Sequence, residues 1–333
     1  MEPIDMVAPG LEGTVEVHSY LGPGDERSLA DDVLDGLTRP LKELPPKHLY
    51  DARGSRLFDA ICELPEYYQT RTERLILEAH ADDIVEHTGA VELVELGSGS
   101  ATKTRVLLDA MDVAGTLRRY VPVDVSATTV HAIAELFTDE YPGLAVHGVV
   151  GDFERHLDNL PAPAGPRLVP FLGGTIGNFP PGSRRRFLRS LAKVLGPDGH
   201  LLLGTDLVKD PLVIEAAYDD SAGVTAQFNL NLLVRANREL GADFNLHCWH
   251  HRAIYNDREH RIEMHLISEL DQVVQLGGRS FAFAAGEIII TEFSYKHTID
   301  GFTALAVSAG FKLSHYWTDP GQMFAVFHFT VAA

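Results

Sequence analysis

The 333-residue sequence contains little cysteine and no long apolar run. Its two cysteines, Cys62 and Cys248, lie far apart and outside any C-x-x-C pair, which argues against a disulfide framework and a structural zinc site. No stretch approaches the roughly 18 apolar residues of a membrane span, and the N-terminus lacks the basic start and apolar core of a signal peptide. We therefore expect a soluble protein of the reducing cytoplasm.

Positive charge is also scarce. Lys and Arg number 28 against 47 Asp and Glu, so the formal net charge is -19. A surface of this sign repels phosphate backbones and anionic lipid, which excludes nucleic acid and membrane partners. Apolar residues, in contrast, make up 45% of the chain, enough to bury a sizeable core in two domains or in one domain with a large insertion.

The first quarter of the chain has an irregular pattern. Residues 1–24 mix Gly, Pro and acids without a period, which predicts a flexible tail or an edge strand. Residues 25–72 start with a helical pattern and continue with prolines and aromatics. Thr70 and Glu73 have the spacing of a capping box, so we expect a helix to begin there and to end at Gly89.

From residue 90 the chain alternates apolar strands with amphipathic helices. The expected strands are 91–96, 119–125, 144–152, 167–174 and 199–207. The expected helices are 102–113, 126–141 and 182–196. Ser126 and Ser183 have the positions of N-caps, and Gly196 with Pro197 stops the last of these helices. This alternation predicts an α/β fold with a doubly wound, Rossmann-like parallel sheet.

The C-terminal third adds two features. Residues 312–318 and 323–331 predict an antiparallel hairpin, a closure that resembles class I S-adenosylmethionine (SAM) methyltransferases more than dehydrogenases. Before it, one long helix ending at Gly241 precedes strands with period-2 alternation. We expect an α+β substrate-binding domain and a SAM-binding domain. The substrate-binding domain would comprise 25–72 and 209–297, and the SAM-binding domain 73–208 and 298–333.

The loop GSGSATKT at 97–104 narrowly misses two nucleotide motifs. From Gly97 it would match a P-loop or the G-x-G-x-x-G dinucleotide fingerprint if position 102 were Gly, but Thr102 stands there. Both motifs use that glycine to bring the backbone close to a diphosphate or a helix. SAM has no diphosphate, so the missing glycine counts least against SAM.

Polar residues at the ends of the next strands point to an adenosine ligand. Asp124 ends the second strand, where an acid can accept both ribose hydroxyls. Asp152 and Phe153 end the third, where they offer an acid for an exocyclic amine and a ring to face adenine. Alone, Gly97 could be a turn glycine and Asp124 a helix cap. Together these residues indicate SAM as the cofactor.

The histidine-rich run HCWHH at 247–251, with His260 and His265, raises the question of a metal site. Histidines three apart do not share a strand face, and no catalytic carboxylate motif accompanies them. Methyl transfer also needs no metal ion. We therefore expect a solvated strand face and no metal.

Several longer motifs occur in order along the chain. They are PPKHLYDARGSRLFDAICELPEYYQTRTE, VELGSGSATKTR, FLGGTIGNF, LLLGTDLVKD, AYDDSAGVTAQFN and TEFSYK. Through them the chain, from about residue 25 to 330, resembles the L-histidine Nα-methyltransferases of ergothioneine biosynthesis. The resemblance implies three SAM-dependent methylations of L-histidine, through its Nα-methylated intermediates, to the betaine hercynine. We further expect a monomer.

The resemblance also implies roles for individual residues. It implies SAM binding by Gly97, Lys103, Asp124, Asp152 and Phe153. It implies histidine binding by Tyr67, Asn178, Tyr218, Met264, Glu292, Phe293 and Ser294. Tyr50 and Tyr67 are the catalytic candidates, which would orient the reacting amine or relay its proton. Lys103 is expected to reach the carboxylate of the methionine moiety of SAM.

The chemistry of these residue types agrees with an amino acid substrate. Methyl transfer to an amine is an in-line displacement in which alignment matters more than a strong acid. Glu292 and Ser294, two apart on an expected strand, face one side and could bond the two imidazole nitrogens. Two alternatives stay open. One is a SAM-dependent N-methyltransferase of another amino acid, such as an indole one, and the other is a non-catalytic SAM or nucleotide-binding module.

Overall fold

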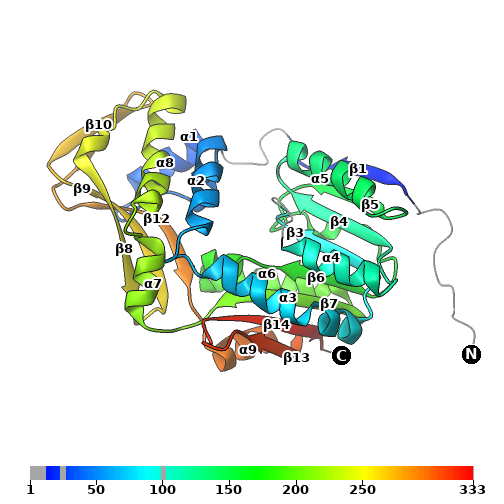
Figure 1. The fold of residues 1–333 in the computed structure, drawn as a ribbon. Helices are drawn as coiled ribbons and strands as arrows, with labels where there is room; N and C mark the ends of the chain where they lie inside the picture. Colours follow the sequence, from blue (N-terminus) through cyan, green and yellow to red (C-terminus); the bar gives the residue numbers. More distant parts are fainter. Residues whose placement is uncertain (1–12, 23–27, 99–102, 333) are drawn as a thin grey trace, which may run out of the picture.

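The structure is a computed structural model that describes residues 13–22, 28–98 and 103–332 (Figure 1). Its larger part is an eight-stranded sheet in the order β1-β5-β4-β3-β6-β7-β14-β13. The strands are β1 Val15–Ser19, β3 Glu92–Leu96, β4 Arg119–Asp124, β5 Ala145–Val150, β6 Arg167–Phe171, β7 Gly199–Asp206, β13 Phe311–Thr318 and β14 Phe324–Val331.

Six neighbouring strands, from β1 to β7 in this order, are parallel, and β14 pairs antiparallel with both β7 and β13. The predicted doubly wound sheet with a C-terminal antiparallel hairpin is therefore confirmed. This is the class I SAM methyltransferase architecture, in which ligands bind beyond the carboxyl ends of the parallel strands.

One part of the N-terminal prediction was wrong. Residues 15–19 are not a loose tail, because β1 pairs with β5 along its length, with Val15 opposite Val146 and Ser19 opposite Val150. The edge-strand alternative holds for this segment. Its backbone is satisfied by β5, and Val17 packs close to Val130 of α5 across Gly148.

Helices cover both faces of this sheet. One core includes side chains of α3 Gln69–Thr88, α4 Thr104–Val113 and α5 Ala127–Glu140. The core on the other face includes side chains of α6 Pro181–Leu195, α9 Ile299–Ser308 and the short helix η2 Leu157–Asn159. The burial of apolar side chains on both faces explains why the strands read as near-continuous apolar runs.

Some of the predicted helix starts hold and others do not. Ser126 caps α5 through a hydrogen bond from the Thr129 backbone N–H, as expected. Ser183 caps nothing, because α6 already begins at Pro181, whose fixed φ suits a first turn. The capping box at Thr70 and Glu73 is also wrong: α3 begins at Gln69, and Glu73 is fully buried inside the molecule.

The second part of the molecule contains a four-stranded sheet, β2-β12-β9-β8 (Figure 1). Its strands are β2 Lys42–Glu43, β8 Trp249–Asn256, β9 Arg261–Ser268 and β12 Ile288–Tyr295, and β10 Gln272–Leu276 pairs with β11 Arg279–Phe283. The helices are α1 Leu29–Thr38, α2 Ala52–Cys62, α7 Pro211–Tyr218 and α8 Val224–Leu240, with short helices η1 Pro46–Leu49 and η4 Leu246–Cys248. These elements share a separate apolar core.

The single long helix expected before Gly241 is in fact two, α7 and α8. The Asp220 carboxylate accepts hydrogen bonds from the backbone N–H groups of Val224 and Thr225, at 2.9 and 2.7 Å, and so caps a new helix. Gly223, with φ +71°, makes the turn between them.

The small sheet meets the large sheet at the carboxyl end of β7. Leu207, just after β7, forms a parallel bridge with His297, just after β12, and the His297 N–H donates to the Asp206 carbonyl at 3.1 Å. The last residues of β12 thus lie at the carboxyl end of β7. Among the described residues, no helix has the length and apolar character needed to cross a membrane.

Candidate active site

A cavity of about 1160 Å³ lies where the two sheets meet. Pockets for single small ligands have volumes of roughly 300–1,000 Å³, so this one has room for a cofactor and an amino acid together. Its lining includes these predicted site residues: Tyr50, Tyr67, Gly97, Lys103, Phe153, Asn178, Tyr218, Met264, Glu292 and Ser294. The fold therefore brings both sets, from distant parts of the chain, to one cavity.

Gly97 and Phe153 form the wall beside β3. Gly97 has φ +75°, a left-handed conformation that favours glycine, and its N–H donates to the Val123 carbonyl at 2.8 Å. A Cβ at Gly97 would lie 3.6 Å from the Phe153 ring, which is itself held edge-on by Phe171 at 5.6 Å. Gly99 and Thr102 lie outside the described residues.

Asp124 and Asp152 stand at the same edge of the sheet but are not part of the cavity lining. The Gly151 N–H donates to the Asp124 carbonyl at 2.9 Å, which keeps the two strand ends together. The Asp124 carboxylate accepts from the Ser126 N–H at 2.9 Å, and that of Asp152 accepts from the Glu154 N–H at 2.8 Å. Their roles in SAM binding stay predictions.

Lys103 points into the cavity and forms an ion pair with Glu73 of α3. Glu73 also accepts the Gly173 N–H at 2.8 Å. A Cβ at Gly204 of β7 would lie 1.9 Å from the Glu73 carboxylate, so only glycine allows this buried acid to reach its place. Glu73 thus orients the ammonium group of Lys103 at the cavity wall.

Strand β12 presents three polar side chains to the cavity at every second position. Glu292, Ser294 and Lys296 all line it. Phe293 does not: it lies on the opposite face, where the Arg261 guanidinium stands 4.1 Å from its ring centre. The prediction that Phe293 contributes to the histidine pocket is not supported, because successive strand residues point to opposite faces.

Four polar groups at the cavity are left without a partner. Among the described residues, no hydrogen bond is made by the hydroxyls of Tyr50 and Tyr67, the side-chain amide of Asn178 or the carboxylate of Glu292. Tyr67 and Glu292 are buried, and buried polar groups are normally paired, so at a cavity wall they are available to a ligand; Tyr50 is exposed and Asn178 half-buried. Burial raises the pKa of Glu292 to about 7, although Lys296 opposes this shift.

Behind Ser294 lies a buried polar network centred on Lys296. The ammonium donates to Ser294 Oγ and to the Tyr218 hydroxyl, each at 3.0 Å, and pairs with Asp206 at 3.0 Å. Gln69 Nε2 donates to the Tyr218 hydroxyl at 3.2 Å and to Asp206 at 3.1 Å.

Two lysines, Lys296 and Lys209, pair with the carboxylate of Asp206. Burial raises the pKa of Asp206, but Lys296 and Lys209 outweigh burial and hold it below its ordinary value. Burial lowers the pKa of Lys296, but Tyr218 and Asp206 raise it above its ordinary value. The network therefore holds a charged lysine and a charged aspartate at neutral pH.

The aromatic side of the cavity is formed by Tyr50 and Tyr67. Tyr50 packs edge-on against Phe58 and Phe228, both at 5.4 Å between ring centres. Tyr67 packs against Tyr218 at 6.2 Å. Burial raises the pKa of Tyr67 well above its ordinary value, so this phenol keeps its proton.

Asn178 and Met264 complete the substrate side. Asn178 ends the short helix η3 Thr175–Asn178, which follows β6. This helix packs directly on β12, since a Cβ at Gly177 would lie 2.8 Å from the Tyr295 carbonyl oxygen and 3.2 Å from Ser294 Oγ. Met264, on β9, is paired with Glu292 and is almost fully buried.

The histidine-rich run has a structural role. His251 Nδ1 lies 2.8 Å from Asn229 Nδ2, and His251 Nε2 lies 2.8 Å from the Tyr218 carbonyl oxygen. His265 lies 3.0 Å from Glu263. Both histidines are buried, so the expected solvated face holds for His250 but is wrong for these two. The ring of His251 positions the end of α7, which carries Tyr218.

Sequence reasoning missed several residues of the site. Lys296 continues the spacing of Glu292 and Ser294 and could have been found from it. Gln69, Glu73 and Asp206 had no such signal as a group, because the contacts of Gln69 with Asp206 and of Glu73 with Gly173 join residues 137 and 100 positions apart.

Comparison with known proteins agrees with this geometry. The family described as histidine-specific, SAM-dependent methyltransferase matches residues 29–331. The chain is 48% identical over 316 residues to the histidine N-alpha-methyltransferase of Mycolicibacterium smegmatis, covering 94% of this chain and 98% of that one. It is 46% identical over 315 residues to that of Mycobacterium tuberculosis, with the same coverage.

A more distant relative is the L-tryptophan methyltransferase of Psilocybe serbica, which is 29% identical over 330 residues and covers 89% of this chain and 91% of that one. The family match extends over both sheets except strand β1 and includes every residue of the cavity wall named above. The chain belongs to the histidine-specific, SAM-dependent methyltransferase family.

Proposed function

We propose that this protein transfers three methyl groups in succession from SAM to the α-amine of L-histidine and releases hercynine, the first product of ergothioneine biosynthesis. The observation that supports this most directly is the pairing of Glu292 with Ser294 in the same cavity as Gly97, Lys103 and Phe153. The mycobacterial relatives, which are named histidine N-alpha-methyltransferases, support the substrate and the position of methylation.

The Lys296 network gives Ser294 a defined direction of hydrogen bonding. An ammonium and an amide NH₂ can only donate, so Lys296 and Gln69 occupy the acceptor sites of the Tyr218 hydroxyl. Lys296 also donates to Ser294 Oγ, and the Tyr218 hydroxyl lies 3.1 Å from the same oxygen. The Ser294 proton is therefore directed toward the ligand.

Glu292 and Ser294 then match a neutral imidazole. The ring has one N–H donor and one nitrogen lone pair, and here it meets a carboxylate acceptor and a hydroxyl donor. An indole has only the N–H, so it would leave the Ser294 proton without a partner in a buried site. A buried donor without an acceptor costs about 1–3 kcal/mol, which favours histidine over tryptophan.

The rest of the substrate lies toward the other unpaired groups. We assign the substrate carboxylate to the side-chain amide of Asn178. The Tyr218 hydroxyl, which donates to Ser294 Oγ at 3.1 Å, acts on the substrate through Ser294. We assign the reacting amine to the hydroxyls of Tyr50 and Tyr67. Because Tyr67 stays protonated, it orients the amine and does not act as a base.

The cofactor occupies the side of the cavity next to β3. Phe153 offers a ring beside adenine, and Asp124 and Asp152 would take the ribose hydroxyls and the exocyclic amine. Lys103 has three donor hydrogens, of which Glu73 uses one, so the others can reach the carboxylate of SAM. In-line transfer then requires that nitrogen, methyl and sulfur be aligned and that the amine be neutral, so that its lone pair forms the new C–N bond as the methyl–sulfur bond breaks. The proton that each methylation releases passes to water.

A panel assay tests the proposal. The protein is incubated with SAM and each free amino acid in turn, and the products are analysed by mass spectrometry. Histidine should gain one, two and then three methyl groups, and tryptophan none. Methylated tryptophan with unchanged histidine would support the indole alternative, and SAM binding without any methylated product would support a non-catalytic module. A cytoplasmic location and a monomeric state stay predictions, the second of which gel filtration checks.

A further inference from the structure

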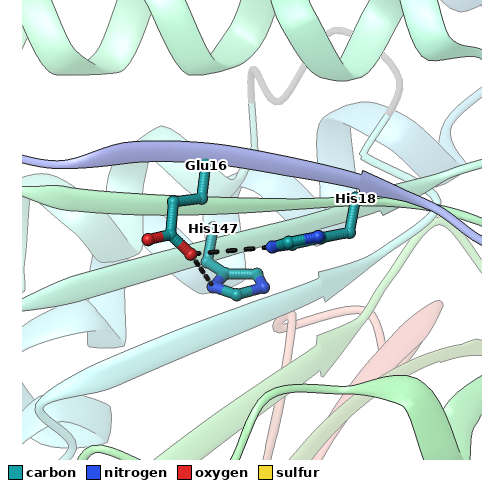
Figure 2. A group of neighbouring side chains, drawn as sticks. All are labelled: Glu16, His18 and His147. Atoms are coloured by element: carbon teal, nitrogen blue, oxygen red, sulfur yellow. Dashed lines mark ion pairs between the residues drawn. The ribbon is translucent and has the colours of Figure 1, made fainter.

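Three side chains with metal-binding atoms meet on the outer edge of the large sheet. Glu16 and His18 lie two residues apart on β1, and His147 lies on β5 directly opposite Glu16 (Figure 2). The strand register therefore makes all three project from the same face. Their ligand atoms lie within 4.8 Å of one another. We propose that they bind one late first-row divalent cation, of which Zn²⁺ is the example, and that this ion joins β1 to β5.

The distances favour shared coordination over simple ion pairs. Glu16 Oε2 lies 3.6 Å from His18 Nε2 and 3.6 Å from His147 Nδ1. A charge-assisted hydrogen bond between such groups measures about 2.7–2.9 Å. Two ligands each ~2.1 Å from the same tetrahedral zinc lie about 3.4 Å apart. The observed separations are close to the second value, so small side-chain rotations suffice to bind an ion.

The site is open on the side where an ion would enter. The other face of β1 is covered, since Val17 lies close to Val130 of α5 across β5. On the ligand face, the side chains of Glu16, His18 and His147 are 59%, 50% and 20% exposed. Water can therefore supply the fourth ligand.

The ligand types define the class of cation. Two imidazole nitrogens and one carboxylate suit Zn²⁺, Ni²⁺ or Cu²⁺, whereas Mg²⁺ and Ca²⁺ require mostly oxygen ligands. Glu16 and His18 lie outside the residues 29–331 that match the methyltransferase family, and none of the three ligands lines the active-site cavity, so this site is separate from methyl transfer. Its effect is to fix the edge strand, whose next residue, Tyr20, still donates to the Val150 carbonyl at 2.9 Å.

Calorimetric titration of the full, tag-free chain with ZnCl₂, after removal of bound metal with a chelator, tests the site. We expect one ion per chain and a rise in the melting temperature. Glu16→Gln, His18→Ala and His147→Ala should each weaken zinc binding by more than the ~10- to 100-fold that loss of an outer-shell partner costs. Excess Mg²⁺ should not compete.

His250→Ala is the matched control, because His250 forms an exposed pair with Glu269 at 3.4 Å. It should leave zinc binding unchanged. All three ligands are at least partly exposed, so the variants should fold, as circular dichroism can verify. Undiminished zinc binding in the His18→Ala/His147→Ala double variant, or none in the parent protein, would overturn the proposal.

Discussion

Replacing Glu292 with Gln should stabilise the ligand-free protein at alkaline pH while it weakens histidine binding. Glu292 is only 9% exposed, and its carboxylate has no hydrogen-bond partner among the described residues. Burial raises its pKa to about 7 from an ordinary 4.5. The folded protein therefore holds this proton more tightly than the unfolded chain does.

The sign and size follow from proton linkage. The stabilisation due to the bound proton is complete below about pH 4.5 and is lost as the pH rises through about 7. A shift of 2.5 pKa units (7 − 4.5) at 1.36 kcal/mol each corresponds to about 3 kcal/mol. Gln cannot ionise, so the Glu292→Gln protein does not lose this stability. Between about pH 5 and pH 8, the difference in unfolding free energy should grow by roughly 2–3 kcal/mol in favour of the variant.

Urea denaturation of both proteins at several pH values, without ligand, measures this difference. Glu263→Gln on the adjacent strand serves as a control. Hydrogen bonds and the charge of Arg261 outweigh the effect of burial and lower the pKa of Glu263 below 4.5, so its effect falls at more acid pH. That variant should give a difference that is flat from about pH 5 to pH 8. A flat difference for Glu292→Gln would refute the reasoning.

Three further variants test the rest of the site. Lys296→Met should raise the KM for histidine about 10- to 100-fold, which corresponds to the loss of one or two hydrogen bonds to a charged group, and should change the SAM affinity less than about twofold. An equal loss of histidine and SAM affinity in equilibrium binding would assign Lys296 to general stability. Lys103→Ala should weaken SAM binding about tenfold or more in calorimetry and leave histidine affinity nearly unchanged, and an unchanged SAM affinity would remove its assigned role. Phe293→Leu lies on the face of β12 away from the cavity, so this apolar exchange should affect the stability of the protein and alter the KM for histidine less than about twofold. A large increase in that KM would place Phe293 in the pocket after all.

Local patterns predicted the elements and one face of the pocket. The alternation of strands and helices predicted the parallel sheet, and two-residue spacing placed Glu292 and Ser294 together. The same rule places Phe293 on the opposite face and Lys296 on the face of the cavity. Ser126 was recognisable as a cap because capping is a contact over three residues.

Long-range contacts could not be read in this way. Thr70 and Glu73 had the spacing of a capping box, but Glu73 is instead paired with Lys103 and the Gly173 N–H, which are 30 and 100 residues away. The cluster of Glu16, His18 and His147 was invisible for the same reason, since only the pairing of β1 with β5 brings these residues together. Sequence patterns therefore show which residues lie on the same element, but not which side chains of different elements pair with one another.

The junction of the two sheets has a consequence for substrate length. Strand β12, to which we assign the imidazole, is joined by backbone hydrogen bonds to the end of β7, in the sheet that carries the proposed cofactor site, through Leu207 and His297. The distance between the imidazole site and the methyl donor is thus fixed by the main chain and not by mobile loops. An amino acid with the same ring but one extra methylene would place its amine beyond the position that is aligned with the methyl group. A misplacement of about 1 Å costs ~100-fold in rate. Homohistidine should bind and yet receive its methyl group slowly.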